Sequence, residues 1–175
     1  MFANLLKKQW INSYGCLVGL LLGIVALSIY QYTVGWANSY WVHDELSLVT
    51  GFSVWAIILF ALALVVANLA HFLGEKKGFL KDVCFYVAGA LEIVSCCFLL
   101  ASGIIFIGDR AEGIAYILFS DASVLTQVQT PANMFSVNLS IAATIIYIIA
   151  GLVPVVTSFF PFIRHTEKKE EVTQA

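Results

Sequence analysis

Four long apolar stretches, separated by short polar segments, dominate the pattern of this 175-residue chain. A bilayer core about 30 Å thick needs about 20 consecutive apolar residues in a helix, and each stretch reaches or slightly exceeds that length. Inside a bilayer the backbone must satisfy its own hydrogen bonds, so apolar runs of this kind form helices. The pattern therefore predicts an all-α, polytopic membrane protein, an antiparallel bundle of four transmembrane helices over residues 14–32, 50–72, 83–107 and 131–162.

Basic residues give this bundle an orientation. Eight of the nine Lys and Arg residues fall on one side of the four helices, namely Lys7, Lys8, Lys76, Lys77, Lys81, Arg164, Lys168 and Lys169. Short basic loops stay in the cytoplasm, so we expect a multi-pass protein of the plasma membrane with both termini cytoplasmic. Residues 163–175 are then a charged cytoplasmic tail, which we expect to be disordered. The first apolar run exceeds a typical secretory signal core and no Ala-x-Ala site follows it, so we expect it to remain as a helix.

Composition excludes several other classes. The chain is 61% hydrophobic and only 11% charged, against about 45–50% and about 25% in soluble domains. The expected outer loops hold five acidic residues and one cation, Arg110, which disfavours nucleic-acid binding. Neither outer loop contains a cysteine, so one chain cannot build a disulfide there.

Glycines recur every fourth residue in the first apolar stretch, at Gly15, Gly19 and Gly23. This spacing puts them on one helix face, where another backbone can approach closely, as in small-xxx-small packing motifs. That face packs either inside the bundle or against another copy or another membrane protein, and the sequence leaves both alternatives open.

The second expected outer loop is long, and its composition is distinctive. Asp109, Arg110, Glu112 and Tyr116 are candidates for contacts with a partner. Apolar residues that follow, Ile114, Ile117 and Leu118, could form the face of a short interfacial helix. Thr130 and Pro131 have the form of an N-cap followed by proline at the first helical position, so we expect the fourth helix to begin there.

Glu92 is the one acidic residue deep within an expected membrane span. It lies eleven positions after Lys81, which at about 1.5 Å per residue places it near the middle of the bilayer core. Ser95 and Cys96 share its side of the helix and complete a candidate intramembrane polar site. Two interpretations remain: a neutral Glu92 that hydrogen-bonds to a Ser, a Tyr or a backbone carbonyl, or an acid that titrates during transport.

The layout resembles that of uncharacterised four-helix membrane proteins of Firmicutes bacteria. The resemblance covers nearly the whole chain and includes Asp109-Arg-Ala-Glu-Gly113, Tyr116-Ile-Leu-Phe-Ser120 and Gln129-Thr-Pro-Ala-Asn133. It implies a bacterial plasma-membrane location and assigns no catalytic residue.

These observations favour a non-enzymatic accessory or scaffold subunit that works through helix–helix and outer-loop contacts. Its expected partners are the lipid bilayer and either further copies of the chain or another membrane protein. No catalytic, cofactor-binding or metal-binding residue emerges from the sequence. A small transporter or channel subunit that uses Glu92 is the alternative, and a membrane enzyme of unknown reaction is the third interpretation.

Overall fold

The computed structural model describes residues 11–35, 46–72 and 78–160. All regular secondary structure in these residues is α-helical. Four helices are long: α2 (Ile11–Gly35), α3 (Ser47–Phe72), α4 (Gly78–Phe119) and α6 (Pro131–Thr157). The short helix α5 (Ala122–Val128) connects α4 to α6. The expected charged tail, 163–175, lies outside the described residues.

The four long helices are each long and apolar enough to cross a bilayer. The chain is therefore a multi-pass membrane protein, and the all-α class predicted from its apolar runs is confirmed. Large apolar side chains remain exposed along all four helices, for example Leu21, Val65, Ile104 and Val156. Such a surface suits hydrocarbon rather than water as its surroundings.

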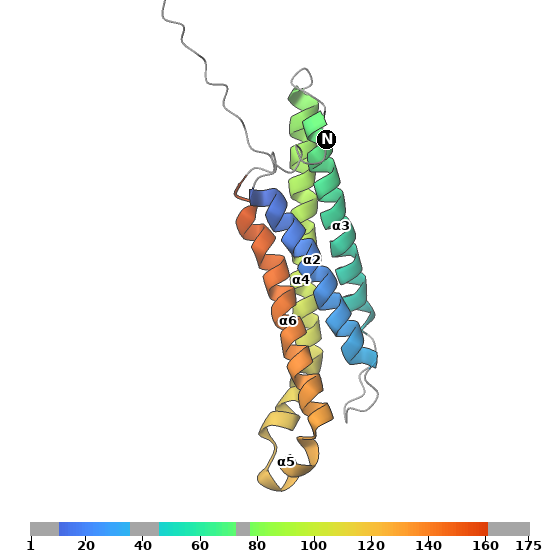
Figure 1. The fold of residues 1–175 in the computed structure, drawn as a ribbon, viewed down its shortest axis with the longest axis vertical. Helices are drawn as coiled ribbons and strands as arrows, with labels where there is room; N and C mark the ends of the chain where they lie inside the picture. The colour runs from blue at the N-terminus through green and yellow to red at the C-terminus, as the bar shows by residue number, and fades with distance from the viewer. Residues whose placement is uncertain (1–10, 36–45, 73–77, 161–175) are drawn as a thin grey trace, which may run out of the picture.

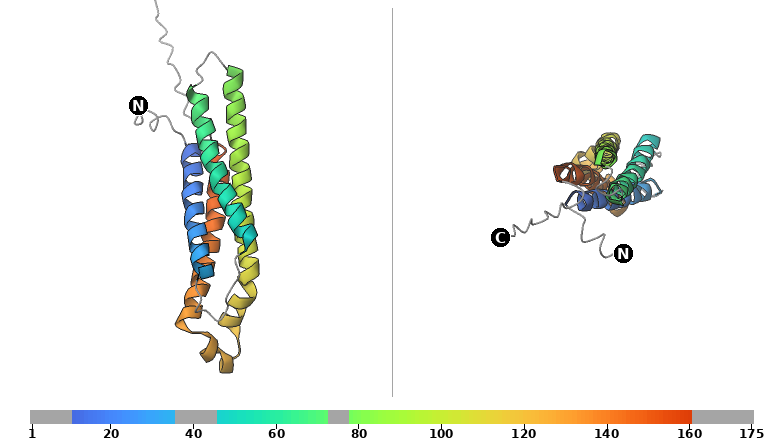
Figure 2. Two further views of the ribbon diagram at one scale, coloured as in Figure 1. Left: turned by 90° about the vertical axis from the view of Figure 1, so that its right-hand side faces the viewer. Right: turned by 90° about the horizontal axis from the view of Figure 1, so that it is seen from above.

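The helices form an antiparallel bundle in which α3 packs along α4, and α6 packs against both α2 and α4 (Figures 1 and 2). We call the end at which α2 and α4 begin the basic end, because eight of the nine Lys and Arg residues adjoin it along the sequence. The opposite end is the α5 end. Both views show α3 and α4 continuing past α2 and α6 at the basic end, whereas α4 and α6 continue past α2 and α3 at the α5 end.

Helix α4 is much longer than its sequence predicted. The predicted span was 83–107, yet the helix runs without interruption over 42 residues, from Gly78 to Phe119. At about 1.5 Å per residue it is about 63 Å long, more than a bilayer of about 40–45 Å with its headgroups. Gly108 and Gly113 suggested a loop, but glycine costs a helix only about 1 kcal/mol, and the contacts of the neighbouring residues offset that cost.

A short helix was predicted in the second outer loop, around Ile114, Ile117 and Leu118. The structure has such a helix, but at a later position. Ile114, Ile117 and Leu118 belong to the last turns of α4, and Ile117 is buried there. The separate short helix, α5, starts only after Asp121. Side-chain bonds order this connection: Gln129 Nε2 donates to the carbonyl of Ile117 at 3.1 Å, and Asn133 Nδ2 donates to that of Val128 at 2.7 Å.

The start of α6 follows from its sequence, but its end does not. The Thr130 hydroxyl accepts from the Asn133 N–H at 3.2 Å and Pro131 is the first helical residue, as predicted. The helix ends at Thr157 rather than at the predicted 162. Near that end Pro154 lies inside the helix, where it has no N–H to give to the Ala150 carbonyl.

Candidate functional site

The face of α4 that points into the bundle carries four polar residues: Glu92, Ser95, Ser102 and Arg110. All four are buried, with exposed fractions of 0–2%. They lie three to eight positions apart and alternate with Leu99 and Phe106, which are also fully buried. Polar groups on the inner face of a membrane bundle mark candidate functional positions, so we treat this face as the candidate site.

Glu92 contacts Asn12, a residue that the sequence analysis did not identify. Asn12 Nδ2 donates to Glu92 Oε2 at 3.2 Å, and both side chains are buried. The predicted partners were a Ser, a Tyr or a backbone carbonyl. No sequence pattern relates these residues, because they are 80 positions apart and only the assembly of the bundle, in which α2 packs mainly on α6 and α3, brings them together.

The Asn12 contact also changes the position assigned to Glu92. Asn12 is the second residue of α2 and follows Lys8 by only four positions. Along α4, Glu92 is eleven residues from Lys81 but 17 from Asp109, or about 16 Å and about 25 Å. Glu92 therefore lies toward the basic end of the bundle rather than at its middle.

The other two predicted members of the polar site are close in sequence but do not bind Glu92. The Ser95 hydroxyl donates to the Leu91 carbonyl of its own helix at 2.7 Å. Cys96 is buried one turn beyond Glu92, whereas its neighbour Cys97 is exposed. On the α2 side Cys16 takes the equivalent place, one turn beyond Asn12, and its thiol lies 3.7 Å from the Phe60 carbonyl.

A second polar cluster joins three helices farther along the bundle. Ser53 Oγ of α3 lies 2.9 Å from Tyr147 Oη of α6 and 3.2 Å from Ser102 Oγ of α4. Ser102 also donates to the Phe98 carbonyl at 2.9 Å. All three side chains are fully buried, and they satisfy one another without needing a ligand.

Arg110 was predicted to make outer-loop contacts, and the structure corrects this. It lies inside α4 and faces the bundle, because the buried positions Phe106, Arg110, Gly113 and Ile117 follow the helical repeat. Its Cζ is 5.5 Å from the centre of the Phe106 ring. Nε forms an ion pair with Asp109 Oδ2 at 3.7 Å, a distance too long for a hydrogen bond.

The Arg110 guanidinium consequently has no hydrogen-bond acceptor among the described residues. Nε, Nη1 and Nη2 are all buried and without a partner there. The nearby Tyr30 hydroxyl is engaged at the start of α3, where it accepts from the Leu46 N–H at 2.6 Å. A buried cation without acceptors is costly, so Arg110 is the least satisfied polar residue in the described part of the chain.

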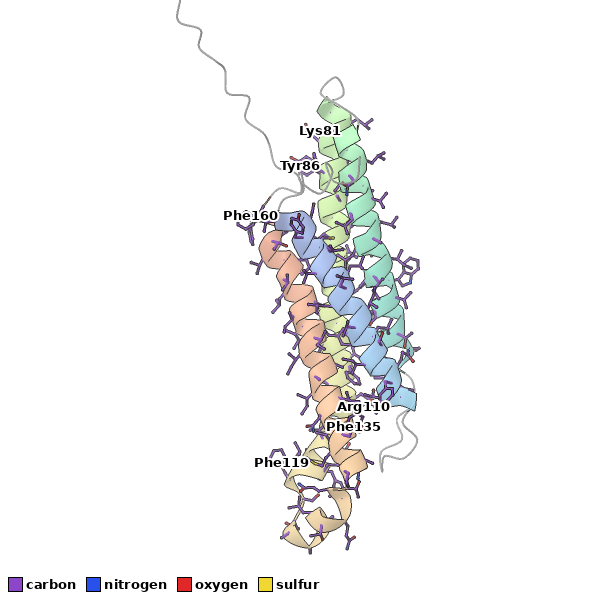
Figure 3. The ribbon with its side chains drawn as sticks, viewed as in Figure 1. Lys81, Tyr86, Arg110, Phe119, Phe135 and Phe160 are labelled. Carbon is purple, nitrogen blue, oxygen red and sulfur yellow. The ribbon has the colours of Figure 1, made fainter. Side chains whose placement is uncertain are left out.

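The opposite face of the same helical segment is exposed. Asp109, Glu112, Tyr116 and Phe119 follow one another at intervals of three or four residues, and all are exposed. Phe119, at 82%, is among the most exposed aromatic side chains (Figure 3). We call these four residues the α5-end stripe. It keeps three of the four predicted contact residues and adds Phe119, which an interrupted helix could not have aligned with them.

The glycine face of α2 is filled from within the chain. A Cβ on Gly19 would lie 2.5 Å from Pro154 Cγ and 3.1 Å from the Ala150 carbonyl oxygen. A Cβ on Gly15 would collide with the Thr157 side chain, and one on Gly23 would meet Leu99 at 3.4 Å. Of the two alternatives for this face, the structure therefore supports packing inside the bundle.

No group of three His, Cys, Asp or Glu side chains that could hold a metal occurs within residues 11–35, 46–72 and 78–160. His43, Asp44 and Glu45 lie outside these ranges. Comparison of the chain with protein-family models, curated proteins and solved structures gives no match. The resemblance to four-helix Firmicutes proteins stays a prediction, and function has to be inferred from the residues.

Proposed function

We propose that this chain is a non-enzymatic accessory or scaffold subunit of the plasma membrane, with both termini in the cytoplasm. The orientation rests on the position of the basic residues. The α5-end stripe then lies on the outer side, where we propose that it contacts another membrane protein.

The single observation that carries this proposal is the alignment of the α5-end stripe on the exposed face of one uninterrupted helix. Its four residues stand on a continuous helix whose inner face is buried at Arg110, Gly113 and Ile117. Hydrogen bonds from Gln129 and Asn133 fix the connection that follows. An ordered surface loses little conformational entropy on binding, so this stripe is well suited to a lasting contact.

The chemistry of the stripe indicates the kind of partner. Glu112 calls for a cationic side chain opposite it, and the exposed Phe119 ring needs an apolar recess. A symmetric contact between two copies through the same stripe would oppose carboxylates and is disfavoured. The proposed partner is therefore a different membrane protein with a basic and apolar surface on the outer side.

A photo-crosslinking amino acid at position 119 tests this proposal in cells. We expect a discrete crosslinked product that Glu112→Lys removes, and Phe119→Ala is expected to weaken co-purification of the same partner by at least about tenfold, since a hot-spot side chain contributes about 2 kcal/mol or more. The matched control is a crosslinker at Ile104, which is 66% exposed within the apolar part of α4. Equal products from both positions, or products insensitive to Glu112→Lys, would refute a specific contact at the stripe.

A small transporter or channel subunit is the second candidate, and one observation favours it. Glu92 and Arg110, on the same inner face of α4, both have buried polar atoms without partners in the described residues. Between them, however, Ser53, Ser102 and Tyr147 bind one another, and Leu99 and Phe106 are fully buried. If this candidate is right, the chain reconstituted alone should give pH-dependent flux that Glu92→Gln abolishes.

A further inference from the structure

The contact between Asn12 and Glu92 is incomplete in a specific way. One hydrogen bond joins the two groups, from Asn12 Nδ2 to Glu92 Oε2. Each group also has one buried oxygen without a partner among the described residues, Asn12 Oδ1 and Glu92 Oε1. The two oxygens without a partner therefore belong to the same two side chains that the hydrogen bond already joins.

The protonation state of the carboxyl decides whether these oxygens can be satisfied. An ionised carboxylate only accepts hydrogen bonds, as does an amide oxygen, so the ionised form leaves both oxygens unpaired. A neutral carboxyl has one O–H donor, and one proton can satisfy both oxygens at once. An acid and an amide are then self-complementary, since each donates one hydrogen bond and accepts one.

We propose that Glu92 is a proton-binding site whose neutral carboxyl donates to Asn12 Oδ1 while it accepts from Asn12 Nδ2, so that a two-bond ring joins the start of α2 to α4. Loss of the proton breaks the donated bond and leaves a buried charge beside an amide oxygen. The ring therefore holds the first turn of α2 against α4 only while the proton is bound. This inference does not depend on the proposed contact function.

The surroundings supply no alternative counter-charge within the described residues. The titratable side chains one turn away are two thiols, Cys16 on α2 and Cys96 on α4. Between positions 60 and 70 of α3, and between 150 and 157 of α6, no titratable side chain occurs. Arg110 is 18 positions along α4, or about 27 Å away.

The site is also close to an aqueous phase. Asn12 follows the first described residue of α2, and Lys8 precedes it by four positions in the sequence. Basic segments mark the aqueous side of a membrane span, so we infer that the path from Glu92 to water at the basic end is short. The proton can be taken from, and returned to, water on that side.

Infrared spectroscopy of the purified chain in lipid nanodiscs tests the proton directly. At neutral pH we expect the C=O band of a protonated carboxylic acid, which shifts in D2O and vanishes in Glu92→Gln. The matched control is Glu112→Gln, which removes an exposed carboxyl of the same helix and should leave the band unchanged. Absence of the band in the wild type would overturn the proposal without the use of any variant.

The ring itself is tested by Asn12→Leu and by the pH dependence of unfolding. Asn12→Leu should move the acid band to higher frequency, and an unmoved band would refute the ring. If the carboxyl is neutral when folded and ionised when unfolded, the native state binds one more proton than the unfolded state. The unfolding constant of the wild type should then rise with pH, by up to about tenfold per pH unit.

The Glu92→Gln variant should not show this rise, because a glutamine amide keeps both hydrogen bonds to Asn12 at every pH. Identical pH dependence in the wild type and Glu92→Gln would show that Glu92 is not the proton site. Neither result bears on crosslinking at position 119, so failure of this inference and failure of the proposed function are distinguishable.

Discussion

Gly19→Leu is expected to destabilise the folded bundle by at least about 3 kcal/mol. A single Cβ at this position would already lie 2.5 Å from Pro154 Cγ and 3.1 Å from both the Ala150 carbonyl oxygen and Phe60 Cζ. Overpacking a core typically costs about 1–3 kcal/mol, and a leucine adds three more carbons to that Cβ. Titration with SDS in mixed micelles, with unfolding followed by fluorescence, measures the loss.

Gly89→Leu is the matched control for this substitution. It makes the same change in α4, where a Cβ would meet no atom within 4 Å. Because leucine favours the helix over glycine by up to about 1 kcal/mol, this variant should be as stable as the wild type or slightly more stable. Equal stabilities for the two leucine variants would contradict the packing of α2 against α6 through its glycine face.

Arg110→Met is expected to stabilise the purified chain, whereas Gly19→Leu is expected to destabilise it. The Arg110 guanidinium is buried and its three nitrogens have no hydrogen-bond acceptor among the described residues. A buried charge without hydrogen-bond acceptors carries a desolvation cost of several kcal/mol, and an apolar side chain of similar volume removes that cost. Methionine suits the position because its unbranched chain can follow the path of the arginine stem beside Phe106. The same SDS titration measures the gain.

Lys81→Met removes one positive charge from α4 at a position that is not buried. Surface substitutions usually change stability by less than about 0.5 kcal/mol, so this variant separates the effect of burial from that of net charge. If Arg110→Met destabilises the chain instead, the guanidinium has an acceptor in the folded protein. Asp44 and Glu45, which lie outside the described residues, would then be the carboxylates to replace next.

The sequence predicted the number and the type of the long helices because the bilayer imposes the rule. Twenty or more apolar residues in a row must satisfy their backbone hydrogen bonds internally, whatever they pack against. The start of α6 was predictable for a similar reason, since Thr130 and Pro131 act within one helical turn. Local rules failed at Gly108 and Gly113, where the glycines suggested a loop. Burial of Phe106, Gly113 and Ile117 against the bundle continues the helix instead.

In the candidate site, too, some residues could be predicted from the local sequence and others depend on packing between helices. Glu92 could be identified from the sequence, because an acid within an apolar run is costly wherever the helix packs. Its partner could not, since Asn12 is 80 positions away and has no pattern in common with it. Arg110 was assigned to the outside because the third span was predicted to end at residue 107. Its inward direction follows from its register on α4, which only the continuous helix defines.

By itself, then, the sequence determined a multi-pass helical membrane protein, the intramembrane acid Glu92 and the glycine face of α2. Each of these depends on composition or on spacing within one helix. The tertiary structure decided what those features contact: α6 meets Gly15 and Gly19, Asn12 meets Glu92, and the α5-end stripe points away from Arg110. Contacts between helices depend on the relative shift and rotation of whole segments, and no local periodicity encodes either quantity.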